Sequence, residues 1–150
     1  MKRYWLTPPE LYESLDNEFH FDFDPCPCPR PANYNSLNID WKNMNFVNPI
    51  FRQKDSRCEG QFKNFDDTLH KRSIKELKGP TAYVRKAIAE QKKGNSSFLT
   101  LPTQSYVNLL LEAGAKLRSL GRVKWLEVNT KEAWKTPSPI TGFFLEGDST

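Results

Sequence analysis

The stretch "NFVNPIFRQ", residues 45–53, decides the fold. It begins as a run too apolar for a strand that faces water, and it ends in Asn48 and Pro49 before turning basic at Arg52. Proline has no N–H group and interrupts the ladder of a central strand, so the strand that starts at Met44 is expected to end here. Ligands of open α/β sheets gather beyond the carboxyl ends of the strands. The sequence therefore predicts a functional site at Asn48.

A second strand end of the same kind precedes this one. The stretch "HFDFDPC", residues 20–26, alternates apolar and polar side chains and is stopped by Pro25. Its last polar residue, Asp24, is suited to hold a hydroxyl or an ammonium group. We expect Asp24 and Asn48 to face one crevice, because both follow strands of the same sheet.

The chain between residues 5 and 19 has the signals of a helix start. Thr7 can cap the helix, the two following prolines fit a first turn that needs no N–H bonds, and Glu10 can complete a capping box. Apolar residues then recur at every fourth position and give the helix one buried stripe, formed by Leu11, Leu15 and Phe19.

Helices and strands alternate through the rest of the chain. Helices are predicted over residues 81–94 and 103–115, and strands over 97–102, 121–128 and 140–147. This order predicts a single α/β domain with a mixed sheet and a C-terminal pair of strands. The residues expected to bound the two helices are Thr103 at a start, and Gly94 and Gly114 at the ends.

The composition is that of a folded, basic protein. The chain has 150 residues, of which 37% are hydrophobic, and this is enough to bury a core. Its net charge of +4 and its pI near 9.0 suit a polyanionic partner. No apolar run approaches the roughly 20 residues that a membrane-spanning helix needs, so we expect no membrane association.

The cysteines indicate thiols rather than disulfides or a zinc site. Their number is odd and no secretory segment precedes them, so we expect reduced thiols and a cytoplasmic protein. The "CPCP" stretch lacks the two- to four-residue spacing typical of zinc ligands, so no metal is expected. The three residues are Cys26, Cys28 and Cys58.

Residues 52–80 form a long polar insertion directly after the predicted site. They hold eight Lys or Arg against five Asp or Glu, so most of the positive charge of the chain lies here. A compact domain rarely carries so long a connection without a function, although a solvated surface insertion is the alternative. As candidate DNA contacts in this segment we single out Arg52, Lys54, Arg57, Lys63, Lys71 and Arg72.

The residues "NPIF" can hold an amino group against an electrophile. The side-chain oxygen of Asn48 and the backbone carbonyl of Pro49 can both accept hydrogen bonds from one exocyclic amine. Phe51 supplies a flat face on which a base can stack, a contact worth about 1–3 kcal/mol. These are the requirements of an enzyme that alkylates an amine on a flipped base.

Four stretches together resemble one family. "YWLTPPELYESLDNEFHFDFDPCP", "DWKNMNFVNPIF", "LTLPTQSY" and "GRVKWLE" are similar, in this order, to the phage-type, Dam-like DNA N6-adenine methyltransferases. The resemblance covers most of the chain apart from residues 52–80. It implies a small Rossmann-like fold that binds S-adenosylmethionine and methylates adenine in DNA, in the host-cell cytoplasm if the protein is phage-encoded.

The resemblance also implies roles for individual residues. The catalytic motif would grip the target amine and stack on its base through Asn48, Pro49 and Phe51. The cofactor pocket would be lined by Thr7, Pro8 and Asp24, and Asp40 would contact the adenosine of the cofactor.

Two departures from the family pattern keep alternatives open. Ile50 stands where the family has a second proline, and the basic insertion follows the motif at once. A catalytically degenerate methyltransferase fold, serving as a DNA-binding or anti-restriction module, is one alternative. Methylation of another exocyclic amine, such as cytosine N4 or a base in RNA, is the other. The sequence indicates no particular oligomeric state.

Overall fold

The structure is a computed structural model, and it describes six stretches of the chain. Within them the chain forms three α-helices, one short 3-10 helix and two β-sheets. The basic insertion that the sequence predicted at residues 52–80 lies outside these stretches, apart from its last residue. The described stretches are residues 5–26, 36–49, 80–103, 106–127, 133–135 and 140–149.

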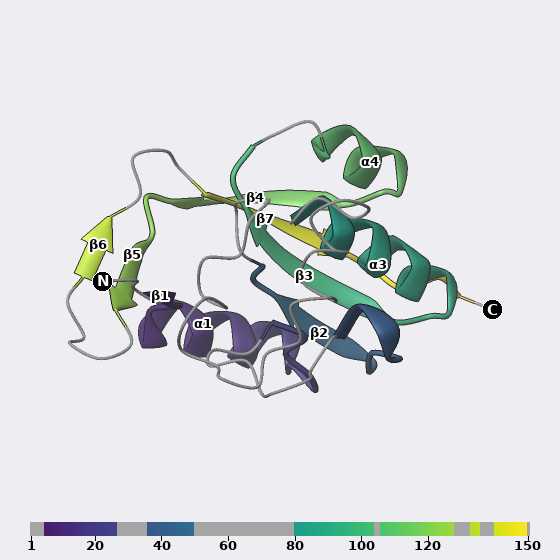
Figure 1. Ribbon diagram of the computed structural model, residues 1–150, viewed down its shortest axis with the longest axis horizontal. Helices are drawn as coiled ribbons and strands as arrows, with labels where there is room; N and C mark the ends of the chain where they lie inside the picture. Colours follow the sequence, from purple (N-terminus) through teal and green to yellow (C-terminus); the bar gives the residue numbers. More distant parts are fainter. Residues whose placement is uncertain are drawn as a thin grey trace.

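The main sheet has four strands in the order β2-β3-β7-β4 (Figure 1). They are β2 (Met44–Val47), β3 (Ser96–Leu101), β4 (Lys116–Gly121) and β7 (Ile140–Leu145). Strand β3 is parallel to β2, whereas β7 is antiparallel to both of its neighbours. The expectation of an α/β protein with a mixed sheet is therefore confirmed.

A single bridge extends this sheet beyond β2. Phe23 forms an isolated parallel bridge with Asn45, and the Phe46 N–H donates to the Phe23 carbonyl at 2.9 Å. The sequence predicted a strand over residues 20–26, and this was wrong in extent. The pairing cannot continue because Pro25 has no N–H and the Asp24 carboxylate folds back to accept from the backbone of Cys26.

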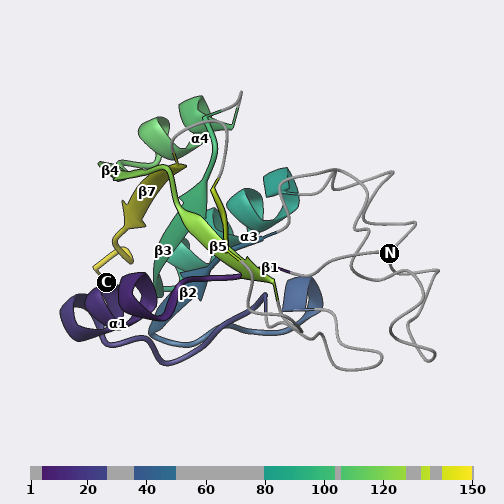
Figure 2. The same ribbon diagram turned by 90° about the vertical axis from the view of Figure 1, so that its left-hand side faces the viewer.

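Helices cover both faces of the main sheet (Figures 1 and 2). Side chains of a strand alternate between the two faces, so successive residues enter different cores. Phe46 and Phe98 pack with Leu15 of α1 (Pro9–Phe19), on one face. On the other face, Val47, Leu99, Leu101, Phe143 and Leu145 pack with residues of α3 (Pro80–Lys92) and α4 (Val107–Glu112).

A second, smaller sheet lies where β2 and β3 end, at the left of Figure 1. Its three strands are antiparallel, in the order β1-β5-β6. They are β1 (Trp5–Leu6), β5 (Lys124–Glu127) and β6 (Ala133–Lys135). Because β1 immediately precedes Thr7, this pairing brings the start of α1 to the carboxyl edge of the main sheet.

The structure divides one predicted strand between the two sheets. The sequence predicted one strand over residues 121–128, whereas β4 ends at Gly121 and β5 begins at Lys124. Gly121 has a φ of 68°, a left-handed conformation that turns the chain between the sheets. The predicted pairing of residues 121–128 with 140–147 was wrong: β7 pairs with β3 and β4, whereas β5 pairs with β1 and β6 in the smaller sheet.

The predicted helix starts were partly wrong, whereas the predicted ends were right. Pro8 caps α1 without a side-chain hydrogen bond, so Thr7 and Glu10 form no capping box. Helix α4 begins at Val107, after Tyr106, and not at Thr103. The two glycines that follow α3 and α4 have positive φ angles and end these helices as expected, at Gly94 and Gly114.

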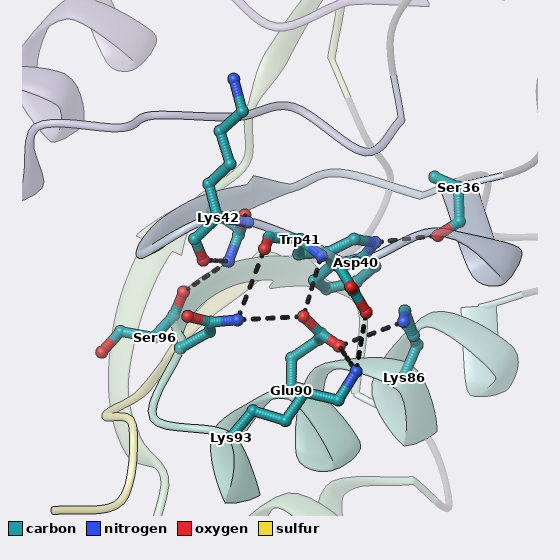
Figure 3. Close-up of polar contacts among 10 residues, drawn as sticks. Ser36, Asp40, Trp41, Lys42, Lys86, Glu90, Lys93 and Ser96 are labelled. Carbon is teal, nitrogen blue, oxygen red and sulfur yellow. Dashed lines mark hydrogen bonds and ion pairs between the residues drawn. The ribbon is translucent and has the colours of Figure 1, made fainter.

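A buried carboxylate ties together the amino ends of β2 and β3 (Figure 3). Glu90, near the end of α3, has no exposed surface, and both of its oxygens accept hydrogen bonds. Oε1 accepts from the Trp41 backbone N–H at 2.8 Å and from Asn95 Nδ2 at 3.0 Å. Oε2 pairs with the Nζ atoms of Lys86 and Lys93, at 3.1 and 3.0 Å.

These contacts join the end of α3 and the start of β3 to Trp41, which is 49 residues from Glu90 in the sequence. Trp41 follows the short 3-10 helix η1 (Ser36–Asn38), and its indole N–H donates to the Ser36 carbonyl at 2.9 Å. Asn95 immediately precedes β3, while Glu90 belongs to α3. The carboxylate therefore fixes how α3 enters β3 and how the chain enters β2.

Hydrogen bonds to the buried carboxylate of Glu90 keep it ionised. Burial alone would raise the pKa of Glu90, but hydrogen bonds from the Trp41 backbone, Lys93, Lys86 and Asn95 outweigh it and lower the pKa to about 2. The carboxylate thus remains ionised inside the protein at neutral pH.

We predict that Glu90→Gln destabilises the fold by about 3 kcal/mol, because it leaves two lysines facing an amide in place of a buried negative charge. Chemical denaturation at pH 7 measures the change. The control is Glu112→Gln, which changes an exposed residue of α4 and should alter stability by less than about 0.5 kcal/mol. An effect of Glu90→Gln as small as that of the control would contradict the role given to this carboxylate.

The same carboxylate predicts a loss of stability in acid. Its folded pKa of about 2 lies below the ordinary 4.5, so its contribution is complete above pH 4.5 and disappears as the pH falls toward 2. A gap of this size corresponds to about 3 kcal/mol. Unfolding free energies measured between pH 6 and pH 2.5 should fall less steeply for Glu90→Gln than for the wild type. Equal slopes for the two proteins would show that Glu90 does not titrate in this way.

Candidate functional site

Two threonines hold the side-chain amide of Asn48 at the carboxyl end of β2. Asn48 Nδ2 donates to Thr7 Oγ1 at 2.8 Å, and Asn48 Oδ1 accepts from Thr100 Oγ1 at 2.9 Å. Thr7 lies between β1 and α1, and Thr100 lies on β3. The amide is therefore fixed at both of its polar atoms by two separate elements.

The sheet register explains why these residues meet. Val47 is paired with Leu99, so the next residues along the two parallel strands are Asn48 and Thr100. Because side chains alternate along a strand, Asn48 points to the same face of the sheet as Phe46, and Thr100 points to the same face as Phe98. That face is the one covered by α1, and Thr7 lies two residues before this helix begins.

The amide of Asn48 retains hydrogen-bonding capacity. Thr100 is fully buried, whereas Asn48 and Thr7 are partly exposed. An amide oxygen has two lone pairs and an amide nitrogen has two hydrogens, and the two threonines use one of each. Within the described stretches the Asn48 side chain makes no further hydrogen bond, so one lone pair and one hydrogen remain for another group.

Asp24 lies at the same edge of the sheet as Asn48. The parallel bridge between Phe23 and Asn45 places Asp24 at the carboxyl end of the neighbouring segment. Its Oδ1 accepts from the Cys26 N–H at 2.8 Å, and the residue is partly buried. The structure joins Thr7 to Asn48 directly, and the register of the bridge sets Asp24 level with Phe46, two residues before Asn48.

Tyr12 of α1 is a further polar residue on this side of the sheet. Burial raises the pKa of its hydroxyl, and the nearby carboxylates of Asp16 and Asp24 raise it further. Its ring meets that of Phe46 edge-on, with the centroids 5.0 Å apart. Tyr12 therefore stays neutral at physiological pH and lies within the electrostatic field of Asp24.

Asp40 lies at the opposite edge of the sheet. It precedes β2 by four residues, so the length of this strand separates it from Asn48. Its carboxylate is exposed and pairs with Lys93 Nζ at 2.9 Å, beside the Glu90 contacts (Figure 3). The structure does not bring Asp40 together with the other residues expected to hold the cofactor.

The remaining predicted site residues divide into two groups. Pro8 and Pro49 are described: Pro8 caps α1 and accepts from the Tyr12 N–H at 3.0 Å, and Pro49 is buried directly after Asn48. The aromatic and basic residues expected to stack on a base or contact DNA lie outside the described stretches. These are Phe51, Arg52, Lys54, Arg57, Lys63, Lys71 and Arg72.

Sequence reasoning missed Thr100 and Tyr106. Thr100 is a polar residue inside an otherwise apolar strand, "FLTL", and that contrast is a signal that could have identified it. The hydroxyl of Tyr106 donates to the carbonyl of Pro102, just beyond β3. Burial raises the pKa of Tyr106, so its hydroxyl is an uncharged donor at this edge.

The described part of the site is neutral apart from Asp24. Around the amide of Asn48 it consists of the hydroxyl groups of Thr7 and Thr100 and the carboxylate of Asp24, which suits recognition of amino and hydroxyl groups. In the described stretches no three His, Cys, Asp or Glu side chains come together as metal ligands do.

None of the helices in these stretches has the length and apolar character to cross a membrane.

Comparisons with protein-family models, with curated proteins and with solved structures found no match.

Proposed function

We propose that this protein transfers a methyl group from S-adenosylmethionine to the exocyclic N6 amine of adenine in DNA. The observation that supports this best is the amide of Asn48, which Thr7 and Thr100 hold in place with one acceptor position left for a ligand. The order of motifs in the sequence, which resembles the Dam-like methyltransferases, supplies the chemistry that such an acceptor would serve.

The sheet arrangement supports a Rossmann-like assignment. The Phe23 segment, β2 and β3 are parallel, and helices lie on both faces of the sheet. In open sheets of this kind ligands bind beyond the carboxyl ends of the strands. Asp24 and Asn48 are at that edge, where the proposed cofactor and target would meet.

The residues present fit S-adenosylmethionine in their donor and acceptor types. The carboxylate of Asp24 is partly buried and suited to accept from a hydroxyl or an ammonium group of the cofactor. When bound, S-adenosylmethionine would supply a methyl carbon for attack by the amine nitrogen; the carbon–sulfur bond would break, S-adenosylhomocysteine would leave, and the methylated nitrogen would lose one proton to solvent. Because Asp40 lies at the other edge and pairs with Lys93, our proposal assigns the cofactor contacts to Thr7, Pro8 and Asp24.

Asn48 and Pro49 would orient the target amine. The second lone pair of Asn48 Oδ1 accepts one N6 hydrogen, and the carbonyl of Pro49 accepts the other. Both contacts favour a geometry in which the nitrogen lone pair faces the methyl group, at the roughly 3–3.5 Å that a near-attack arrangement requires. As positive charge develops on the nitrogen, the same two oxygens stabilise it.

The proposed DNA partner rests on charge. The chain carries +4 overall, and its most basic segment follows the Asn48–Pro49 motif in the sequence. Lysines and arginines in this position would neutralise phosphates on either side of a target base. Phe51, the third residue after Asn48, would stack on that base as the resemblance implies.

Incubation with labelled S-adenosylmethionine and mixed-sequence DNA, followed by digestion to nucleosides, tests the function. We expect the label in N6-methyldeoxyadenosine. Label in N4-methyldeoxycytidine would move the target to another amine, and cofactor binding without transfer would support a degenerate DNA-binding module. Calorimetry that finds no cofactor binding, with or without DNA, would refute the methyltransferase proposal.

We predict that Asn48→Ala lowers kcat by about 100- to 1,000-fold, because the developing charge loses its principal acceptor. Cofactor affinity measured by calorimetry should stay close to that of the wild type. The matched control is Asn108→Ala, an exposed asparagine of α4, which should leave transfer unchanged. Wild-type transfer by Asn48→Ala would remove Asn48 from the mechanism.

A further inference from the structure

We propose that Thr100 is a positioning residue for this transfer. Acting with Thr7, its hydroxyl holds the amide of Asn48 in the orientation that presents Oδ1 to the target amine. The inference rests on the proposed function for its catalytic consequence. The two hydrogen bonds from which it is argued, one to each polar atom of the Asn48 amide, do not depend on that function.

Thr100 is a rigid support for this contact. It lies on β3, an interior strand that pairs with β2 on one side and with β7 on the other. Its backbone is paired with that of Gly142, and its side chain is fully buried. Asn48, in contrast, lies one residue beyond β2 and is partly exposed. The fixed partner in this hydrogen bond is therefore Thr100.

The amide needs such support because its own torsion does not fix it. The terminal χ2 torsion of asparagine is broad, and rotation by half a turn exchanges the oxygen and the nitrogen. An amine that donates hydrogens can be held by Oδ1 but not by Nδ2. The two hydrogen bonds restrict rotation about χ2, and in the arrangement found here Thr100 donates to Oδ1 while Thr7 accepts from Nδ2, which leaves Oδ1 to face the amine.

Packing alone does not call for a hydroxyl at this position. The neighbouring residues on β3 are apolar, and valine has nearly the shape of threonine. A buried hydroxyl is unfavourable unless it is hydrogen-bonded, and the hydroxyl of Thr100 donates to Asn48 Oδ1. The hydroxyl of Thr100 is therefore a buried polar group whose hydrogen bond goes to the amide of Asn48.

The kinetic test compares Thr100→Val and Thr100→Ser with the wild type. Thr100→Val should lower kcat by about 10- to 100-fold, as small misplacements of reacting groups do, while KM for DNA and the Kd for cofactor stay unchanged. Thr100→Ser keeps the hydroxyl and should restore kcat. The control is Thr141→Val on β7, where the side chain points to the other face of the sheet. Wild-type kcat in Thr100→Val would overturn the proposal.

A second pair of variants tests the hydroxyl in case Thr100→Val does not fold. Thr100→Ala and Thr100→Ser differ by one oxygen atom, so their comparison isolates the hydroxyl even if valine is not accommodated. Thermal unfolding shows whether each variant is folded under the assay conditions. We expect the alanine variant to lose kcat as the valine variant does. Equal kcat for alanine and serine would also overturn the proposal.

A readout that needs no activity separates this inference from the proposed function. The side-chain amide signal of Asn48, assigned by its loss in Asn48→Asp, reports in NMR relaxation how firmly the amide is held. Its order parameter should fall in Thr100→Val and be retained in Thr100→Ser and Thr141→Val. An unchanged order parameter in Thr100→Val would refute the positioning role, even if the wild type methylates DNA. Absence of methylation by the wild type would instead refute the proposed function, and the NMR comparison would still decide what Thr100 does.

Discussion

The parallel register of β2 against β3 is the constraint on which the rest of the structure depends. Pairing of Val47 with Leu99 sets Asn48 beside Thr100 and directs alternate side chains into two separate cores. A slip by one residue would turn Asn48 to the opposite face, away from α1 and Thr7. The hydrogen bonds of Glu90 support this pairing, because they join the end of α3 to the residues that lead into β2 and β3.

The amino ends and the carboxyl ends of β2 and β3 are stabilised by different kinds of interaction. At the amino edge a buried carboxylate, Glu90, is matched by two lysines and by backbone and amide donors, which keeps it charged. At the carboxyl edge the contacts around Asn48 are neutral hydrogen bonds. A neutral edge can release or share a hydrogen bond with a ligand at little cost, whereas breaking a buried charge pair would be expensive. The stable edge and the edge available for binding are thus at opposite ends of the same strands.

Local signals in the sequence were reliable where the cause of the structure is local. The apolar run before Asn48, the stripe of α1 and the glycines after α3 and α4 all gave correct expectations. Several helix and strand bounds were wrong, and contacts between residues far apart in the chain were missed altogether. Thr7 has the side chain of a cap, and only the fold shows that it bonds instead to a residue 41 positions away. Asp40 is close to Asn48 in sequence, yet an extended strand carries it to the other edge.

The position of β7 has a consequence for how the protein is made. This strand follows β4 in the sequence and yet fills the place between β3 and β4. At the usual pace of translation, the residues that separate the end of β3 from β7 take roughly 2 to 8 seconds to synthesise. During that time the apolar strand with Leu99 and Leu101 has one unpaired side, which is a template for pairing with other chains. Until β7 is complete, one side of β3 is therefore open to pairing with another unfinished chain.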